Sequence, residues 1–282
     1  MLKRRQAQAE MAQAVLQDVL AERRKHPRMG VRKLLYKLQS SWLARGIRIG
    51  RDGHFALLRR HGLLVTRKRK GFRTTLPGGV RSENLLENRA ITAPDQAYVA
   101  DITYLETEQG FRYLALVTDL YSRKIVGWDL SDSLSQEGVL RAMRQAVRQR
   151  RGRLSGLIHH SDHGVQYASR NYLAFLARHG IRSSMGRVGN AYDNAVAERV
   201  NGILKLEYLL DQRFPDAQAA RKAVQQAIHL YNSDRPHLSL QYRTPAQVYH
   251  LAAGGGPGSR SGAACASAGA VKGRTYPTCC SP

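Results

Sequence analysis

The chain has 282 residues, 43% of them hydrophobic, and a formal net charge of +24 at pH 7. This length is enough for two or three small domains with a sizeable core. All three cysteines fall within the last eighteen residues, which excludes a disulfide framework or a cysteine zinc site in the body of the chain. There is neither an apolar run of about 18 residues nor a signal-peptide pattern, so we predict a cytoplasmic protein that does not span a membrane.

The positive charge is concentrated towards the N-terminus. Residues 1–80 hold 20 Lys and Arg against four Asp and Glu, a net of +16 out of the total of +24. An excess of this size favours a polyanionic partner, and nucleic acid is the usual one. A generally basic protein with scattered charge is the alternative, but the uneven distribution favours a separate DNA-binding region.

Residues 1–70 have the pattern of a small helical module. The predicted helices are 5–24, a second from Val31 onward, and about 51–61. A Gly-containing turn precedes the basic third helix, which predicts a helix-turn-helix-like DNA-binding module, although a helical bundle with a solvated basic face is a serious alternative. The side chains that we predict to contact DNA here are Arg51, Arg59, Arg60, Arg67, Lys68, Arg69 and Lys70. Residues 71–94 are predicted to be a linker with a short helix near 84–88.

From residue 95 the pattern changes to strands. Three runs rich in β-branched and aromatic residues, at 98–105, 111–118 and 125–130, have short connections and predict an antiparallel meander. The next predicted elements are helix 135–151, strand 157–162, helix 172–179, strand 181–185, helix 190–205 and helix 216–231. This order is that of a ribonuclease-H-like α/β domain with a mixed five-stranded sheet, which we place at 95–252 together with a C-terminal helical extension. Residues 253–282, rich in Gly, Ala and Ser, are predicted to be a disordered tail.

Three carboxylates stand out within this α/β pattern. Asp101 lies in the middle of the first strand, Asp162 ends the fourth strand, and Glu198 lies on the helix at 190–205. A carboxylate within an apolar strand is costly to bury unless its charge is compensated, and a hard cation such as Mg²⁺ compensates it. Two such ions can activate an attacking oxygen and stabilise a leaving oxygen at phosphorus. The alternative for each aspartate alone is a strand-end or turn cap, but the three together make that reading poor.

The helix at 190–205 combines Glu198 with groups suited to DNA. Asn190 or Asp193 can cap its first turn. Its predicted buried side consists of Val196, Val200, Ile203 and Leu204. Asn194, Glu198 and Lys205 share another stripe, so we predict that Asn194 and Lys205 contact DNA beside Glu198. A plain surface lysine is the alternative for Lys205.

Several other polar residues have ordinary structural readings. His159, His160 and His163 flank Asp162, but we expect His160 to position the loop and His163 to be solvated, with no ligand among them. Asp119 and Asp193 are better explained as a turn cap and a helix cap. For Arg235 and His237 the alternatives of DNA contact and of anchoring the following helix are equally favoured.

The chain resembles the catalytic (OrfB) proteins of bacterial insertion-sequence transposases, which have a DDE core of the retroviral integrase type. The matching stretches are Val-Ala-Asp101-Ile-Thr-Tyr, Asp119-Leu-Tyr-Ser-Arg-Lys-Ile-Val-Gly-Trp, His160-Ser-Asp162-His-Gly-Val-Gln-Tyr, Gly189-Asn-Ala-Tyr-Asp-Asn-Ala-Val-Ala-Glu198, and Tyr231-Asn-Ser-Asp-Arg-Pro-His-Leu-Ser-Leu. The resemblance covers about 95–250, and the region from His26 onward looks like the family's N-terminal helical module. Arg199 departs from the family, which often has Ser at this position, and this could alter local DNA contacts. The tail has no recognised counterpart.

The resemblance implies Asp101, Asp162 and Glu198 as a metal-binding catalytic triad that uses Mg²⁺, with Mn²⁺ as a substitute. The implied activity is cleavage and joining of DNA strands, with double-stranded element ends and target DNA as partners. A homo-oligomer on DNA, the product of an upstream reading frame as a further partner, and association with the bacterial nucleoid are also expected. Two alternatives are a non-catalytic DNA-binding regulator, which the intact triad disfavours, and a plain ribonuclease-H-type nuclease, which the basic N-terminal module disfavours.

Overall fold

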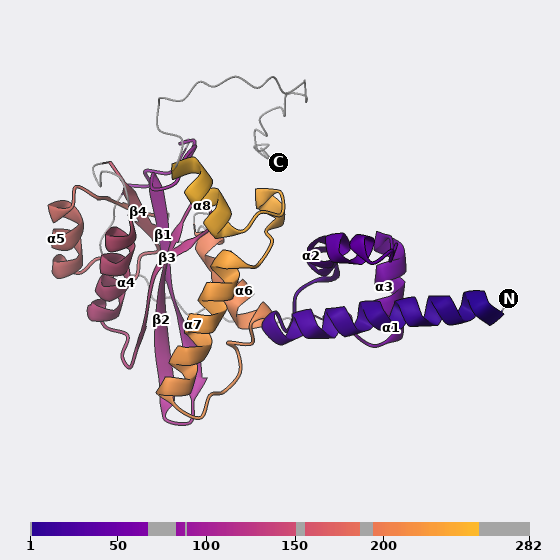
Figure 1. The fold of residues 1–282 in the computed structure, drawn as a ribbon. Helices are drawn as coiled ribbons and strands as arrows, with labels where there is room; N and C mark the ends of the chain where they lie inside the picture. The colour runs from indigo at the N-terminus through magenta and orange to yellow at the C-terminus, as the bar shows by residue number, and fades with distance from the viewer. Residues whose placement is uncertain (1, 67–82, 88, 151–155, 187–193, 254–282) are drawn as a thin grey trace, which may run out of the picture.

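The computed structural model describes residues 2–66, 83–87, 89–150, 156–186 and 194–253. Its helices are α1 (Leu2–Lys25), α2 (Val31–Ala44), α3 (Arg51–Arg60), α4 (Gln136–Gln149), α5 (Arg170–Arg178), α6 (Ala195–Glu207), α7 (Ala217–Ser233), η1 (Leu238–Leu240) and α8 (Pro245–Ala253). Its strands are β1 (Ala97–Thr107), β2 (Gly110–Asp119), β3 (Ile125–Ser131), β4 (Ile158–Ser161) and β5 (Arg182–Met185). Figure 1 shows α1–α3 as a helical module beside a sheet covered by helices.

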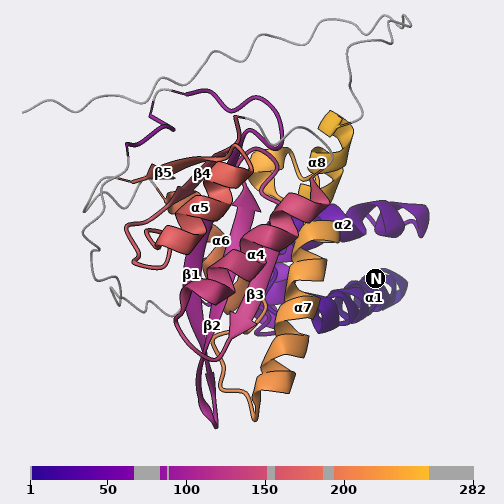
Figure 2. The ribbon, with the colours of Figure 1, turned by 90° about the vertical axis from the view of Figure 1, so that its left-hand side faces the viewer.

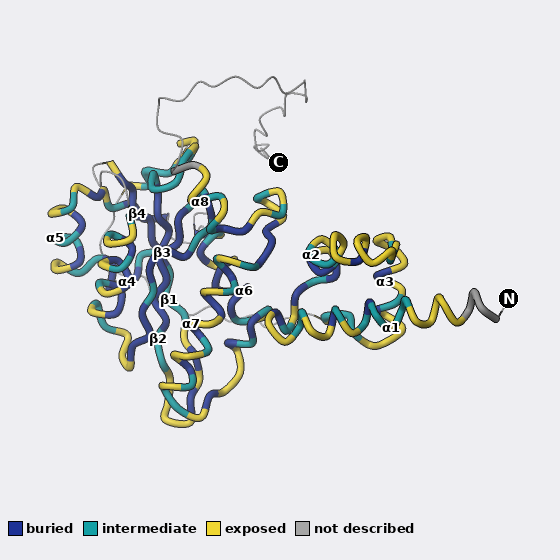
Figure 3. Tube along the Cα trace, viewed as in Figure 1, coloured by how far each residue is buried: buried dark blue, intermediate teal, exposed yellow. Residues whose placement is uncertain are grey.

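The helical module has a small core of its own. Val15 and Val19 of α1 pack with Leu34 and Trp42 of α2 and with Leu58 of α3, and each of the five is at most 1% exposed. The outer part of α1 is exposed (Figure 3), since its apolar spacing is confined to the half that meets α2 and α3. The predicted three-helix arrangement with a turn before α3 is confirmed.

The sheet has the predicted five strands in the order β3-β2-β1-β4-β5. The three long strands form the antiparallel meander, because the turns at 108–109 and 120–124 are too short for any other pairing. β4 lies parallel to β1, and β5 lies parallel to β4, each reached through a helical connection. The mixed five-stranded ribonuclease-H-like fold is therefore confirmed.

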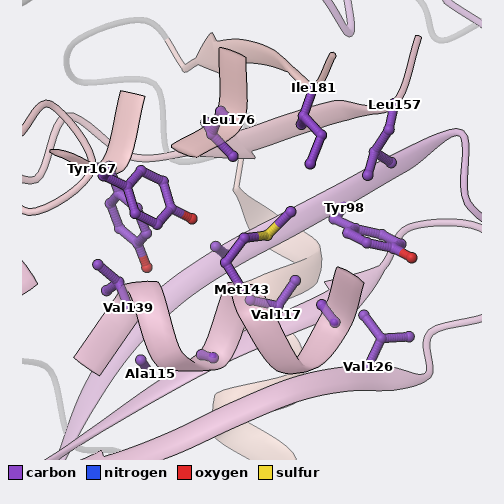
Figure 4. Close-up of a cluster of buried hydrophobic side chains, with 14 of the residues drawn as sticks. Tyr98, Ala115, Val117, Val126, Val139, Met143, Leu157, Tyr167, Leu176 and Ile181 are labelled. Atoms are coloured by element: carbon purple, nitrogen blue, oxygen red, sulfur yellow. The ribbon is translucent and has the colours of Figure 1, made fainter. Parts of the chain in front are cut away.

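Helices cover both faces of this sheet (Figures 1 and 2). α4 and α5 cover one face, where Tyr98, Val117 and Met143 belong to a cluster of buried side chains drawn in Figure 4. α6 and α7 cover the other face, where Leu105 and Leu116 pack with residues of both helices. Side chains at adjacent strand positions therefore belong to hydrophobic clusters on opposite faces of the sheet. Asp101 lies on the face covered by α6, at a position of the kind that apolar residues occupy elsewhere in the strand.

The structure differs from the sequence-based expectations at several places. The predicted helix at 84–88 is a turn at 85–87, where the Asn84 side chain accepts a hydrogen bond from the Leu86 N–H and competes with helix formation. The candidate caps Asn190 and Asp193, the basic run 67–70 and the tail beyond 253 lie outside the described residues. None of the helices in the described part of the chain is both long and apolar enough for a membrane span.

Candidate active site

Strand pairing brings Asp101 and Asp162 to neighbouring positions on one face of the sheet, where β4 ends. In the parallel pair of β1 and β4, Val99 is aligned with His160. Asp101 and Asp162 each lie two residues further along, so the register places them at equivalent positions on neighbouring strands and on the same face. Asp101 is partly exposed, and its Oδ1 accepts a hydrogen bond of 2.9 Å from the Ile102 N–H.

Helix α6 packs on this face and adds the third carboxylate. Its Asn201 donates a hydrogen bond of 2.7 Å from Nδ2 to Oδ2 of Asp101, and Asn194 donates one of 3.2 Å to the carbonyl oxygen of Ala100. Glu198 is four residues after Asn194 and three before Asn201, so the helical repeat places it on the side that faces β1. Its side chain is exposed, which leaves it accessible beside the two aspartates.

The surroundings of Asp101 and Asp162 shift the pKa of both carboxyl groups. Burial, together with the charges of Asp162 and Glu198, raises the pKa of Asp101 to about 7 against the opposing hydrogen bonds from Asn201 and Ile102. Burial also raises the pKa of Asp162, although the Gly164 N–H donates a hydrogen bond of 3.1 Å to its Oδ1. The arrangement therefore concentrates negative charge where little solvent screens it.

This donor set fits a divalent cation. Carboxylate oxygens are the ligands that hard cations prefer, and a cation removes the mutual repulsion that raises the pKa of Asp101. The three groups do not lie within 4.8 Å of one another, unlike Glu22, His26 and Asp234, the cluster of the described residues that does. That second cluster already contains a cation, because Lys37 Nζ lies 2.8 Å from Glu22 Oε1 and 2.6 Å from Asp234 Oδ1.

The histidines around Asp162 support the loops. His159 is buried and contacts the Tyr172 hydroxyl at 2.8 Å, and His160 Nδ1 lies 2.9 Å from Ser184 Oγ on β5. The expectation that His163 is solvated is wrong, because its Nε2 donates a hydrogen bond to the carbonyl oxygen of Gly186 and ties the loop after β4 to the end of β5.

The predicted DNA-contacting residues fall into different environments. Arg51, Arg59 and Arg60 are exposed on α3, and Arg51 forms an ion pair with the neighbouring Asp52. Lys205 places its Nζ 4.3 Å from the centre of the Tyr104 ring, three residues along β1 from Asp101. The prediction for Asn194 needs correction: the side chain is buried, since it bonds to the β1 backbone instead of facing solvent. Arg67, Lys68, Arg69 and Lys70 lie outside the described residues.

Other polar residues prove to be structural. Arg235 is 2% exposed and forms two hydrogen bonds with the Glu207 carboxylate, and His237 packs edge-on against Tyr231. Both side chains therefore make internal contacts, but with the preceding helices α6 and α7 and not with the following helix. Asp119 caps its turn through the Ser122 N–H at 2.7 Å. Sequence reasoning missed Asn201, whose only signal was a polar residue three positions after Glu198 on the same helix face.

The chain is similar to several known proteins. Residues 91–191 match the model of the integrase core domain family, and residues 179–245 match a second integrase core domain model. A putative transposase for insertion sequence element IS986/IS6110 of Mycobacterium tuberculosis is 40% identical over 185 residues, which cover 62% of this chain and 66% of the relative, slightly less than two thirds. A transposase for insertion sequence element IS629 of Shigella sonnei is 36% identical over 225 residues, covering 79% and 74%.

A further relative is the uncharacterized 31 kDa protein of insertion element IS600 of Shigella sonnei, which is 36% identical over 76% of this chain and 81% of its own length. Among solved structures, the HTLV-2 integrase catalytic core domain in complex with magnesium has a TM-score of 0.44 and 20% identity, covering 56% of this chain and 98% of that one. A simian T-cell lymphotropic virus intasome in complex with a PP2A regulatory subunit has a TM-score of 0.48 and 18% identity, covering 79% and 71%. On the evidence of its sequence relatives, the chain belongs to the family of insertion-sequence transposases with an integrase core domain.

Proposed function

We propose that this chain cuts DNA at the ends of an insertion sequence and joins those ends to target DNA, with Asp101, Asp162 and Glu198 as its catalytic residues. The observation that carries the proposal is that carboxylates from the end of β4 and the first turn of α6 lie near enough to Asp101 of β1 for their charges to raise its pKa. An integrase-type core implies the use of divalent metal, and we propose Mg²⁺ as that metal.

The chemistry consists of two displacements at phosphorus. In the first, a water oxygen forms a bond to phosphorus, the bond to the 3′ oxygen breaks, and a free 3′-hydroxyl results. In the second, that hydroxyl forms a bond to a target phosphorus and displaces the 3′ oxygen of the target strand. Two divalent ions bound by the three carboxylates would activate the attacking oxygen and stabilise the leaving oxygen.

The protein's own groups would hold this arrangement in place. Asn201 fixes the orientation of the Asp101 carboxylate through its 2.7 Å hydrogen bond, which leaves the remaining lone pairs of Asp101 for a ligand. The Gly164 N–H does the same for Asp162. Glu198, which is exposed, would complete the set of three carboxylates when the scissile phosphate is bound. We propose that Lys205, whose Nζ lies over the Tyr104 ring, contacts the backbone of the bound end.

The decisive experiment is strand cleavage and joining with the element's own terminal repeats. We expect Asp101→Asn, Asp162→Asn and Glu198→Gln each to lower both rates by about 10³-fold or more, because each removes a ligand charge from the metal site. DNA binding, measured by fluorescence anisotropy, should persist. Asp132→Asn, which changes an exposed aspartate, is the matched control. Wild-type-like joining by any of the three variants would remove that residue from the triad.

The same assay separates the alternatives. Cleavage without joining would favour a plain nuclease, and binding without either reaction would favour a non-catalytic regulator. We further propose assembly as a homo-oligomer on DNA, because two element ends must be joined to one target. The product of an upstream reading frame is a further proposed partner, and co-expression followed by sizing chromatography would test for it.

A further inference from the structure

The helical module meets the catalytic core at the C-terminal ends of α6 and α7 (Figure 1). The Arg28 N–H, in the turn between α1 and α2, donates a hydrogen bond of 3.1 Å to the carbonyl oxygen of Glu207, the last residue of α6. This bond satisfies one of the carbonyls that a helix leaves free at its C-terminus. Tyr36 of α2 stacks on Tyr242 with ring centres 4.4 Å apart. The module is thus joined to the core by backbone and side-chain contacts.

The Glu207 side chain lies at the centre of this contact. Lys33 Nζ of the module lies 2.8 and 3.0 Å from its two oxygens, and Arg235 Nε and Nη2 of the core lie 2.8 and 2.9 Å from them. Lys33 is 9% exposed and Arg235 is 2% exposed. Although burial alone raises the pKa of Glu207, Arg235 and Lys33 lower it to about 2. One carboxylate therefore pairs with one cation from each part of the molecule.

A second cluster supports the same interface from α7. His26 contacts the Tyr208 hydroxyl at 3.0 Å and Asp234 Oδ2 at 2.8 Å, and Lys37 bridges Asp234 and Glu22. Because the Lys37 ammonium occupies the position between the two carboxylates, we interpret this cluster as an ion-pair network and not as a metal site. The module residues His26, Lys33 and Lys37 all point to the ends of α6 and α7.

Helix α6 therefore connects the candidate active site with the interface to the helical module. Glu198 lies in its first turn at the candidate active site, and Glu207 ends it at the module. We propose that Glu207 is a positioning residue for Glu198: docking of the helical module on Glu207 holds α6 at the position in which Glu198 reaches the site of Asp101 and Asp162. This inference rests on the proposed function, and it adds that the DNA-binding module is part of the active-site support.

The charges make this docking sensitive to single changes. Removing the Lys33 charge leaves the buried Glu207–Arg235 pair intact but removes the side-chain contact of the module with Glu207. Removing the Glu207 charge leaves two buried cations next to each other, which is costly in a poorly solvated place. Both changes act on the same contact from opposite sides. Their effects should therefore be non-additive, whereas unrelated changes add.

The test uses the full chain with Lys33→Met, Glu207→Gln and the double variant. Joining is measured at saturating end DNA, together with the dissociation constant for that DNA. We expect each single variant to lower the saturated rate by about tenfold to 100-fold, as misplacement of a catalytic group does, with a change in the dissociation constant below about threefold. The double variant should be no slower than the slower single variant. Lys222→Met, at an exposed lysine of α7, is the matched control and should keep the wild-type rate.

Hydrogen exchange of the α6 amides provides a readout that needs no activity. In Lys33→Met these amides should exchange faster than in the wild type, while those of β2 remain unchanged. Wild-type rates at saturating DNA in Lys33→Met and Glu207→Gln would overturn the positioning role while leaving the proposed function intact. If the wild type itself does not process DNA, the proposed function fails, and unchanged α6 exchange in Lys33→Met would then overturn the docking as well.

Discussion

At the scale of single residues, the proposed site requires a carboxylate at a position where burial of its charge costs free energy. Asp101 lies on the α6 face of β1, where its strand neighbour Leu105 is buried in the core. Its hydrogen bonds from Asn201 and Ile102 do not offset the burial and the neighbouring charges, since its pKa is still raised to about 7. A raised pKa of this kind fits the proposed cation site, because a bound cation would compensate the charge.

The raised pKa predicts a pH dependence of the metal-free protein. The pKa of folded Asp101, about 7, exceeds its ordinary value of 3.8, so between these values the folded state binds more protons than the unfolded state. The contribution of Asp101 to stability is therefore present at low pH and is lost as the pH rises towards 7. In EDTA, we expect the wild-type Tm to fall between pH 5 and pH 8 by more than that of Asp101→Asn.

The control for this experiment is Asp132→Asn, whose side chain is 84% exposed and which should follow the wild type. Addition of Mg²⁺ at pH 8 should restore part of the lost Tm in the wild type and little in Asp101→Asn. An identical pH profile for the wild type and Asp101→Asn would contradict the assignment of the effect to Asp101.

Lys205 is the second residue that predicts a measurable effect. Burial lowers the pKa of Lys205, opposed by the charges of Asp101 and Asp211, and its Nζ lies over the Tyr104 ring. We expect Lys205→Ala to fold normally and to cleave end DNA about tenfold more slowly, through loss of a contact to a phosphate. Lys205→Arg should retain part of the rate, because charge persists while geometry changes. Unchanged Lys205→Ala rates at low and moderate salt would make Lys205 a plain surface residue.

At the scale of elements, close packing fixes the sheet against its helices. Gly127 of β3 faces α4 so closely that a Cβ there would lie 2.1 Å from the Ala142 carbonyl oxygen and 3.0 Å from the Ala146 nitrogen. Both are backbone atoms, which cannot move without displacing the helix. The absence of a side chain at Gly127 therefore explains how β3 and α4 approach each other so closely.

We expect Gly127→Ala to destabilise the protein by about 1–3 kcal/mol or more, since overpacking forces backbone shifts. Urea unfolding measures the change. Gly202→Ala is the matched control, because a Cβ at Gly202 of α6 meets no atom within 4 Å, and Ala in a helix is favoured over Gly by up to about 1 kcal/mol. Equal stabilities of the two variants would show that α4 adapts without cost.

At the scale of the whole molecule, the module and the core cannot be treated as independent. Removing residues 1–80 would test end recognition, but it would also remove Lys33 from the Glu207–Arg235 pair. A truncated core would thus lose both the proposed DNA-binding surface and the support of α6. Point variants on the exposed side of α3 separate these effects, because Arg59 and Arg60 lie away from the interface with the core.

The basic module predicts strongly salt-dependent binding through release of counterions from DNA phosphates. We expect Arg59→Ala combined with Arg60→Ala to reduce the slope of log affinity against log salt by about 2, roughly one for each lost contact. Selectivity for the element ends over unrelated DNA should fall in the same variant. Arg178→Ala, at an exposed arginine of α5, is the control. An unchanged salt slope in the double variant would place the DNA-binding surface elsewhere.

The sequence by itself determined the order of the elements, the three carboxylates and the family. Period-two and period-3.6 patterns reflect local geometry, and short connections permit few pairings, so the meander and the helices followed from neighbouring residues. The same reasoning could give the spacing of Asp101, Asp162 and Glu198 along the chain. It could not give the hydrogen bond of Asn201 to Asp101, because that contact joins residues 100 positions apart.

The tertiary structure alone decided which polar residues are internal. Asn194 and Arg235 have the same chemical groups as residues that contact DNA, yet one bonds to the β1 backbone and the other to Glu207. Only the packing of α6 on the sheet and of the module on α6 places their partners within reach. Burial of a polar group is set by what the rest of the chain supplies as a partner, and a local sequence pattern contains no information about a partner that is distant in the chain.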